Sequence, residues 1–241
     1  MSEDTNRISQ LAELADFVLI KTIEAMNGFS VIAASNMSAI TDRLVVTATL
    51  ARASCDYGRA LITLLRIDHQ DLGAPALSLL RTQLELALRS AFFGEHALDE
   101  ELAYFLKNDD MPKRPDEKGE LKRISLNRLA VIVEPTFALG SDSRMSDAVR
   151  ASLKLLNGHV HGGTPLLNTY QGPSNTIGFV PFKGGTVQTL KYSYAFANLA
   201  MIVLAKVSGM DRSQHCTLFE APYEAAERFS EALEQYAASK A

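Results

Sequence analysis

The sequence lacks an excess of charge of one sign, which limits the partners that its overall field could attract. Its 241 residues include 24 Lys and Arg against 28 Asp and Glu, so the formal net charge is -4 at pH 7. A strongly basic chain attracts polyanions over long distances, whereas a weakly acidic one has no such general field. Any contact with nucleic acid would therefore depend on a local cluster of basic side chains.

Long apolar runs are also missing from the sequence. The longest is AFANLAMIVLA, residues 195–205, well short of the roughly 20 residues needed to cross a bilayer. The first residues, MSEDTNR, are acidic where a secretory signal has a basic segment followed by an apolar one. We therefore expect no membrane contact and a cytoplasmic location.

Several chemical signatures are absent as well. The two cysteines, Cys55 and Cys216, are far apart and have no CxxC spacing, which argues against a zinc site or a disulfide framework. The sequence has no carboxylate or histidine cluster with metal-ligand spacing, no phosphate-binding GxxxxGK or GxGxxG loop and no nucleophile-elbow motif. We therefore predict that the protein uses no metal and no cofactor.

Apolar residues at three- and four-residue spacing occupy most of the chain, and this period predicts an all-α fold. Gly28 is expected to end the first helix, while residues 29–37 lack a clear period and could form a turn or a continuation. Pro75 suits the first turn of the third helix. The predicted helices cover about residues 8–26, 38–66, 74–96, 98–107, 121–134, 143–160, 186–207 and 221–239.

The hydrophobic content of 47% over 241 residues is sufficient for one core. We predict a single domain, residues 1–241, built as an antiparallel bundle of about eight helices. Its centre is expected to contain four helices, which are those at residues 38–66, 74–96, 143–160 and 186–207.

Two segments interrupt the helical period. The segment DDMPKRPDEKGE, residues 109–120, has two prolines, a glycine and eight charged residues, which is typical of an exposed loop. Between about residues 164 and 185, LLNTY and TIGFV flank a Gly-Pro turn and predict two short strands. We expect a small hairpin or folded loop there.

The helix at residues 74–96 carries charged groups between two apolar stripes. Arg81, Glu85, Arg89 and His96 project to one side of it, within about 80° of one another by helical geometry. Burying charge costs several kcal/mol unless the charge is paired and hydrogen-bonded. The row is therefore either a satisfied ladder of ion pairs or the wall of a cleft.

A second polar feature, LNGHVHGGTP, lies far downstream at residues 156–165. Helical phase places His159 beside the core and puts Asn157 and His161 on the polar face. A histidine is also favourable at the negative end of a helix dipole, so an ordinary helix terminus is the structural alternative to a site. Gly158 is expected to loosen the final turn.

These two segments resemble a bacterial family catalogued as an all-helical domain of unknown function. The similarity is carried by ALSLLRTQLELALRSAFF, residues 76–93, and by LNGHVHGG, residues 156–163. More distantly, the helical pattern resembles the HEPN superfamily, which includes ribonucleases, toxins, anti-phage effectors and inactive binding modules. The HEPN motif of arginine, a polar residue and then histidine is matched at its longest spacing by Arg89, Ser90 and His96, with serine in place of the usual asparagine, aspartate or histidine.

The HEPN resemblance implies a HEPN-like helical core and RNA cleavage that needs no metal. His96 or His161 would take the proton of a ribose 2′-hydroxyl, and Arg89 would stabilise the negative charge that develops on phosphate. Arg81 would help to hold the phosphate, and Glu85 would orient the two arginines.

The same resemblance implies further contacts and a dimer with a shared cleft. Asn157 would contribute to the binding surface, and Tyr170 would offer an aromatic face for stacking. RNA or a small anion is the expected partner.

The competing hypothesis is a non-catalytic helical module that binds a partner or oligomerises, with a structural Arg/Glu network. The two hypotheses differ in whether Arg81, Glu85, Arg89 and His161 converge on an open pocket or pair within the core.

Overall fold

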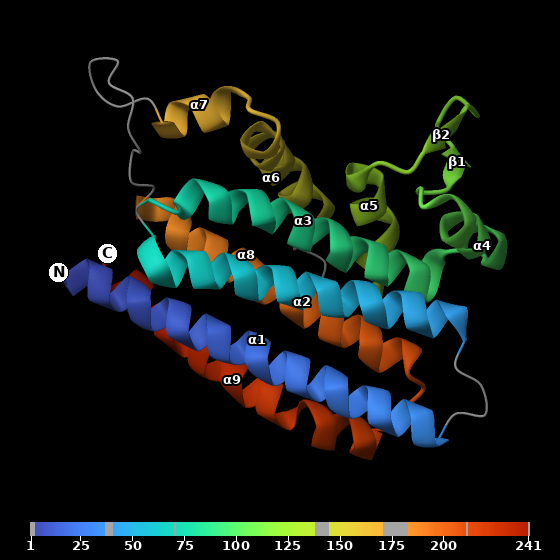
Figure 1. Ribbon diagram of the computed structural model, residues 1–241, viewed down its shortest axis with the longest axis horizontal. Helices are drawn as coiled ribbons and strands as arrows, with labels where there is room; N and C mark the ends of the chain where they lie inside the picture. The colour runs from blue at the N-terminus through green and yellow to red at the C-terminus, as the bar shows by residue number, and fades with distance from the viewer. Residues whose placement is uncertain are drawn as a thin grey trace.

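Five long helices lie side by side and form the body of the molecule (Figure 1). The computed structural model describes residues 3–36, 41–69, 71–137, 145–170, 183–210 and 212–240. The long helices are α1 (Glu3–Asn36), α2 (Asp42–Asp68), α3 (Gly73–Ala91), α8 (Lys183–Val207) and α9 (Arg212–Ala238). This confirms the predicted all-α fold and antiparallel bundle.

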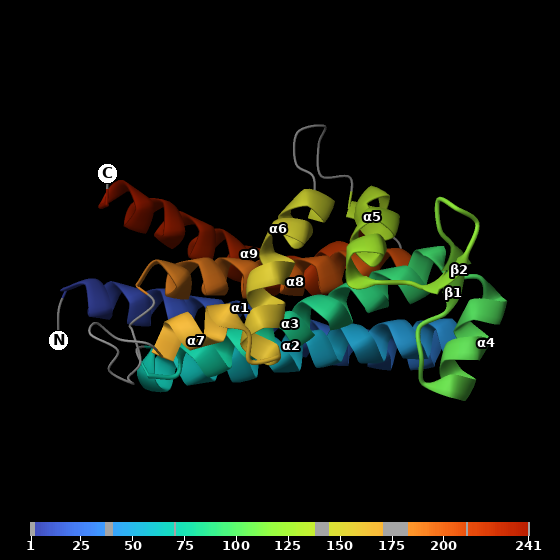
Figure 2. The ribbon, with the colours of Figure 1, turned by 90° about the horizontal axis from the view of Figure 1, so that it is seen from above.

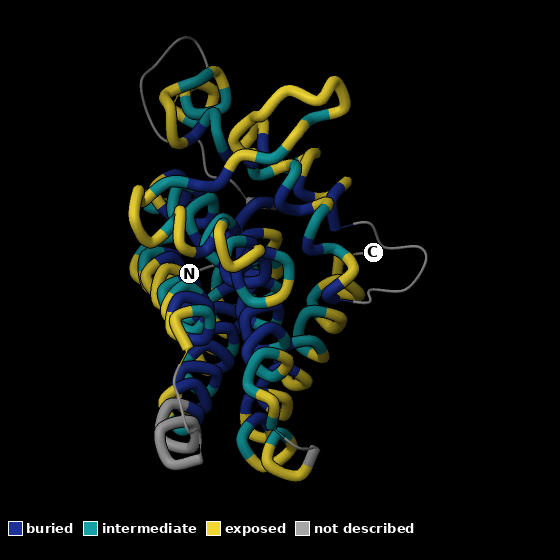
Figure 3. Tube along the Cα trace, turned by 90° about the vertical axis from the view of Figure 1, so that its right-hand side faces the viewer, coloured by how far each residue is buried: buried dark blue, intermediate teal, exposed yellow. Residues whose placement is uncertain are grey.

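The core lies between these long helices. The α2 helix packs against α1, α3 and α8, while α1 also packs against α8 and α9. Buried side chains from each of the five helices join one hydrophobic cluster, including Leu19, Ile62, Leu84, Leu204 and Phe229. In Figure 3 the buried residues follow the inner sides of the helices.

Shorter elements cover the α3 side of the bundle (Figure 2). They are α4 (Asp99–Asn108), α5 (Leu126–Phe137), α6 (Met145–Val160) and α7 (Thr164–Tyr170). The prediction that residues 143–160 belong to the central bundle is wrong, because α6 packs mainly against α3, α5 and α7. Helix α1 instead belongs to the bundle, where it packs against α2, α8 and α9.

The predicted end of the first helix at Gly28 is also wrong. Helix α1 continues to Asn36, and Gly28 lies opposite α9. A Cβ atom at this position would be 2.9 Å from Cδ1 of Leu218. Glycine therefore permits close approach of two helices here and does not end one.

Helix α3 ends earlier than expected and continues as a π-helical turn, η1 (Phe92–His96). Phe92 and Phe93 are adjacent in sequence, yet both are fully buried, with their rings edge to face at a centroid distance of 5.2 Å. The backbone N–H of Ala97 closes the wider turn by donating to the Phe92 carbonyl at 2.8 Å.

The charged segment after α4 forms a small antiparallel hairpin of β1 (Lys113–Pro115) and β2 (Leu121–Arg123). Its residues are mostly exposed, as expected, but the segment is more ordered than the predicted loop. The Asp116 carboxylate accepts backbone N–H bonds from Lys118 and Glu120, at 2.8 and 3.0 Å, and thereby fixes the turn. Because the hairpin uses residues 121–123, α5 starts at Leu126.

The strand predicted at LLNTY is not present, because these residues belong to the short helix α7. Pro165 lies in the first turn of this helix, where its missing N–H has no intrahelical partner to lose. The second predicted strand, TIGFV, and most of the expected excursion lie outside the described residues. Within the described part of the chain, no helix is both long and apolar enough to cross a membrane.

Candidate functional site

The predicted arginine row exists on α3 as a ladder of ion pairs. Arg81 donates from Nη1 to one oxygen of the Glu85 carboxylate, and Arg89 donates from Nη2 to the other. The three side chains are only 20–26% exposed. One carboxylate thus pairs with two guanidinium groups at partly buried positions.

The row contacts α6 through Arg81. Arg81 Nε donates to Asn157 Oδ1 at 2.9 Å, which joins two helices that are 76 positions apart in sequence. The partner on α6 is therefore Asn157, one helical turn before His161. The structure brings together Arg81, Glu85, Arg89 and Asn157.

The charges around Glu85 set its protonation state. Burial disfavours the carboxylate, but this effect is outweighed by the hydrogen bond from Arg81 and by the charges of Arg89, Arg81 and Arg123, so the pKa of Glu85 is lowered. Glu85 is consequently ionised at neutral pH. Arg123, which belongs to β2 and pairs with Asp110 at 2.8 Å, was not among the predicted site residues.

His161 does not join the arginine row. It follows the last residue of α6 and is exposed, and its side chain has no polar partner within the described residues. His159 is buried, as predicted, with Nδ1 3.0 Å from the Leu155 carbonyl and Nε2 3.2 Å from Thr169 Oγ1. The helix remains regular through Gly158 to Val160, so the expected loosening of the final turn is wrong.

His96 lies at the end of η1, where the π-helical turn changes the helical phase. Its Nε2 is 2.6 Å from Thr136 Oγ1 on α5. Burial lowers the pKa of His96, and the charges of Arg114 and Lys206 act in the same direction, while Glu95 opposes them. The imidazole is therefore held neutral and directed toward α5.

The polar residue of the HEPN-type motif has a structural contact. Ser90 is fully buried, and its Oγ donates to the Thr47 carbonyl on α2 at 2.9 Å. Tyr170, the predicted stacking residue, is the last residue of α7 and is 37% exposed.

An apolar cavity of about 630 Å³ lies between α3, α6 and α8. The side chains that line it in the described part of the chain are uncharged, and their polar atoms come from serine, asparagine and tyrosine. The lining residues are Leu80, Leu84, Met145, Ala148, Val149, Ser152, Leu156, Tyr192, Tyr194, Ala195, Phe196, Asn198, Leu199 and Ile202. No site residue predicted from the sequence belongs to it.

The cavity and the arginine row flank the contact between α3 and α6. Arg81 and Glu85 each follow a cavity-lining leucine by one position, and one residue turns a helix by about 100°. The two features are therefore separate sites. The sequence signal for the cavity was the mixed polarity of residues 192–202, where tyrosines and an asparagine interrupt an apolar run.

Asn198 is the polar residue of the cavity whose hydrogen bonding is incomplete. Its Oδ1 is buried and has no hydrogen-bond partner in the described part of the protein. Buried amide groups are usually hydrogen-bonded, because an unmet one costs about 1–3 kcal/mol. Asn198 is therefore a polar side chain of the lining that retains capacity for a further hydrogen bond.

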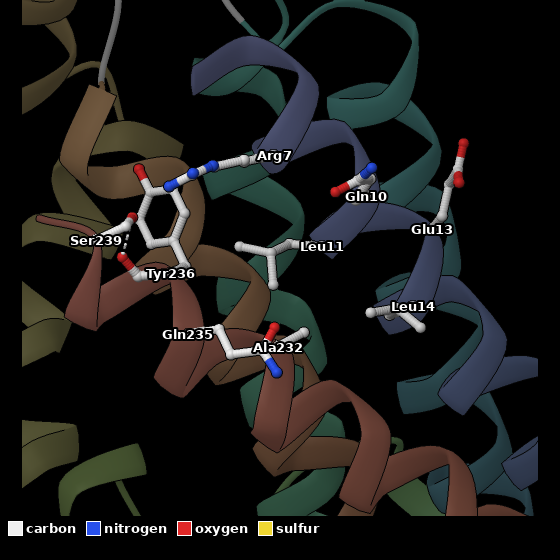
Figure 4. Close-up of a pocket in the computed structure, with 9 residues that line it drawn as sticks. All are labelled: Arg7, Gln10, Leu11, Glu13, Leu14, Ala232, Gln235, Tyr236 and Ser239. Carbon is white, nitrogen blue, oxygen red and sulfur yellow. Dashed lines mark hydrogen bonds between the residues drawn. The ribbon is translucent and has the colours of Figure 1, made fainter. Parts of the chain in front are cut away.

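A second hollow, of about 620 Å³, lies between α1 and α9 near the ends of the described chain (Figure 4). Leu11 and Ala232 contribute apolar surface, while Arg7, Glu13 and Gln235 make much of its border polar. The Tyr236 hydroxyl, which could have faced a ligand here, donates to Asp4 at 3.2 Å. Arg7 also pairs with Glu3, at 2.7 Å. Because these two polar groups have protein partners, this groove is the weaker candidate.

Comparisons of the chain with protein-family models, curated proteins and solved structures gave no match. Among the residues that the structure describes, no group of three His, Cys, Asp or Glu side chains could hold a metal ion.

Proposed function

We propose that the protein is a non-catalytic helical module that binds a small molecule in the cavity between α3, α6 and α8. The observation that carries this proposal is the apolar volume of about 630 Å³, which is within the range of about 300–1,000 Å³ for ligand pockets. A few polar groups in a largely apolar lining are the usual composition of such pockets.

The arginine row supports the non-catalytic hypothesis. Glu85 already pairs with Arg81 and Arg89, and Arg81 holds Asn157 of α6. A phosphate that approached the two guanidinium groups would meet the negative charge of Glu85. The row therefore braces α6 against α3, the two helices that line the cavity together with α8.

The test uses an apolar dye whose fluorescence rises in a dry site, such as N-phenylnaphthylamine. We expect the wild type to bind it and Ala148→Phe to lose binding, because Ala148 lines the cavity and the larger ring would fill it. Ala151→Phe is the matched control, since Ala151 is an exposed residue of the same helix and is not part of the lining. Equal binding by both variants would contradict the proposal.

RNA binding by a HEPN-like dimer is the second candidate. It is favoured by the position of Arg123, whose charge reaches Glu85 together with those of Arg81 and Arg89. Three guanidinium groups thus surround one carboxylate, and Arg89 Nε is buried without a hydrogen-bond partner among the described residues. Two copies of this cluster across a two-fold interface would form a positive patch on an acidic protein.

This candidate is tested with single-stranded RNA in EDTA, measured by fluorescence anisotropy and by cleavage. It predicts that Arg89→Ala weakens binding, and that His96→Ala or His161→Ala abolishes any cleavage while RNA binding persists. A wild-type protein that neither binds nor cuts RNA would leave only the ligand-binding proposal.

A further inference from the structure

We infer that the ligand of the α3–α6–α8 cavity is a neutral, mainly apolar molecule that carries a hydroxyl group. This inference rests on the proposed function and specifies its ligand class. Three features carry it, which are the charge of the lining, the state of Asn198 and the positions of the other polar side chains.

The lining excludes a charged ligand. None of the 14 lining residues that the structure describes is Asp, Glu, Lys, Arg or His. Moving an ionised group from water into such surroundings costs several kcal/mol unless an opposite charge compensates for it. The nearby arginines are engaged by Glu85 on the other flank of the α3–α6 contact, so an anionic head group would remain unpaired inside the cavity.

Asn198 indicates a polar group on the ligand. No hydrogen bond of its side-chain amide is present within the described residues, and its Oδ1 is shielded from water. A carboxamide has one acceptor oxygen and two N–H donors, and its last torsion has two broad, nearly equivalent orientations. A hydroxyl group both donates and accepts, so it can pair with the amide in either orientation.

The positions of the other polar side chains indicate that the ligand hydroxyl lies near α8, where Asn198 is. Tyr194 is close to a partner outside the cavity, with its hydroxyl 3.5 Å from Ser230 Oγ. The described lining from α3 and α6 is mainly leucine, valine, alanine and methionine, with Ser152 as its single polar side chain. The hydroxyl of the ligand is therefore expected at α8 and its apolar body against α3 and α6.

Three probes of similar size distinguish a hydroxyl group, an oxygen without a donor and a charged group on the ligand. They are decanol, methyl nonyl ether and nonanoate. Each is titrated against the dye-loaded wild type, and its dissociation constant is obtained from dye displacement. We expect decanol to bind roughly three- to tenfold more tightly than the ether, as one net hydrogen bond would give. Nonanoate should bind most weakly, because its charge must be desolvated.

Asn198→Leu is the decisive variant, because it keeps a similar side-chain volume and removes the amide. It should still bind the dye, and decanol should lose its advantage over the ether. Wild-type protein alone also tests the inference if this variant does not fold. Equal affinities for decanol and ether, or tightest binding of nonanoate, would overturn the ligand class while the cavity remains a binding site. Failure of the dye to bind at all would instead contradict the proposed function.

Discussion

Glu85 is the single residue on which the α3 ladder depends. Its replacement by alanine would leave Arg81 and Arg89 without a carboxylate at positions that are about four-fifths buried. Removing one member of a buried ion pair is strongly destabilising, and partial exposure reduces the effect, so we expect Glu85→Ala to lower the free energy of unfolding by about 1–3 kcal/mol. Urea denaturation measures this change.

Asp56→Ala provides the control for that measurement. Asp56 also pairs with an arginine at i-4, at 3.1 Å, but its side chain is 53% exposed, and exposed pairs contribute about 0–1 kcal/mol. A loss in Glu85→Ala no greater than that in Asp56→Ala would show that the ladder does not brace α6. The lowered pKa of Glu85 means that its stabilisation is present above the ordinary value of 4.5 and is lost as pH falls through the lowered one.

His96 responds to protonation in the same direction as Glu85, but at a higher pH. Its pKa is lowered from 6.5 mainly by burial, so the unfolded chain binds a proton more readily than the folded one. Stability should therefore be complete above about pH 6.5 and decline as pH falls toward the lowered folded pKa. We expect His96→Gln to flatten this part of a plot of unfolding free energy against pH. If the variant shows the same dependence of unfolding free energy on pH, His96 is not its cause.

At the scale of whole helices, Gly158 allows α7 to pack closely against α6. A Cβ atom at this position would collide with the Pro165 ring of α7. Alanine favours a helix interior over glycine by about 1 kcal/mol, yet we expect Gly158→Ala to displace α7 and to give no net gain in stability. Hydrogen exchange over residues 164–170 should become faster in the variant.

Gly119→Ala is unsuitable as a control for this experiment because its φ is +79°. Ala151→Gly is better, since it changes an exposed position of α6 and should lower stability by about 1 kcal/mol without freeing α7. Unaltered exchange in Gly158→Ala would mean that Pro165 yields easily and that α7 does not depend on this glycine.

The sequence predicted the long helices because their apolar residues repeat with the helical period, as at Leu61, Ile62 and Leu65 of α2. It did not predict η1, since two adjacent buried phenylalanines require a change of phase that no local pattern specifies. Gly28 and Gly158 were assigned local roles as a helix end and a loosened turn. Their actual roles depend on Leu218 and Pro165, which only the tertiary structure brings close.

The candidate site was predictable only in part for the same reason. The row of Arg81, Glu85 and Arg89 follows from four-residue spacing, whereas its contact with Asn157 depends on how α6 packs on α3. The cavity does not follow from the spacing either, because it arises where α6 packs on α3 and leaves space beside α8. The size of such a space depends on the angle and distance at which the helices cross, and hydrophobic periodicity in the sequence does not specify either.

Self-association is the prediction that belongs to the whole molecule. The second candidate function requires two copies of the arginine cluster across a two-fold interface, so it predicts a dimer in solution. Sedimentation velocity at high micromolar concentration should then show a species of twice the chain mass, 26.3 kDa. A strict monomer would remove the support for a shared RNA cleft and would leave the cavity proposal unaffected.

The packing of α1 against α9 has a consequence for synthesis of the chain on the ribosome. Helix α1 ends at Asn36, whereas its partner begins at Arg212, so translation at about 5–20 residues per second separates the two by roughly 10–35 s. During this interval Leu11, Ala25 and other apolar residues of α1 lack the cover that α9 gives them. We expect a nascent chain stalled before residue 212 to be cleaved within α1 by protease and to recruit chaperones, and the complete chain to resist both.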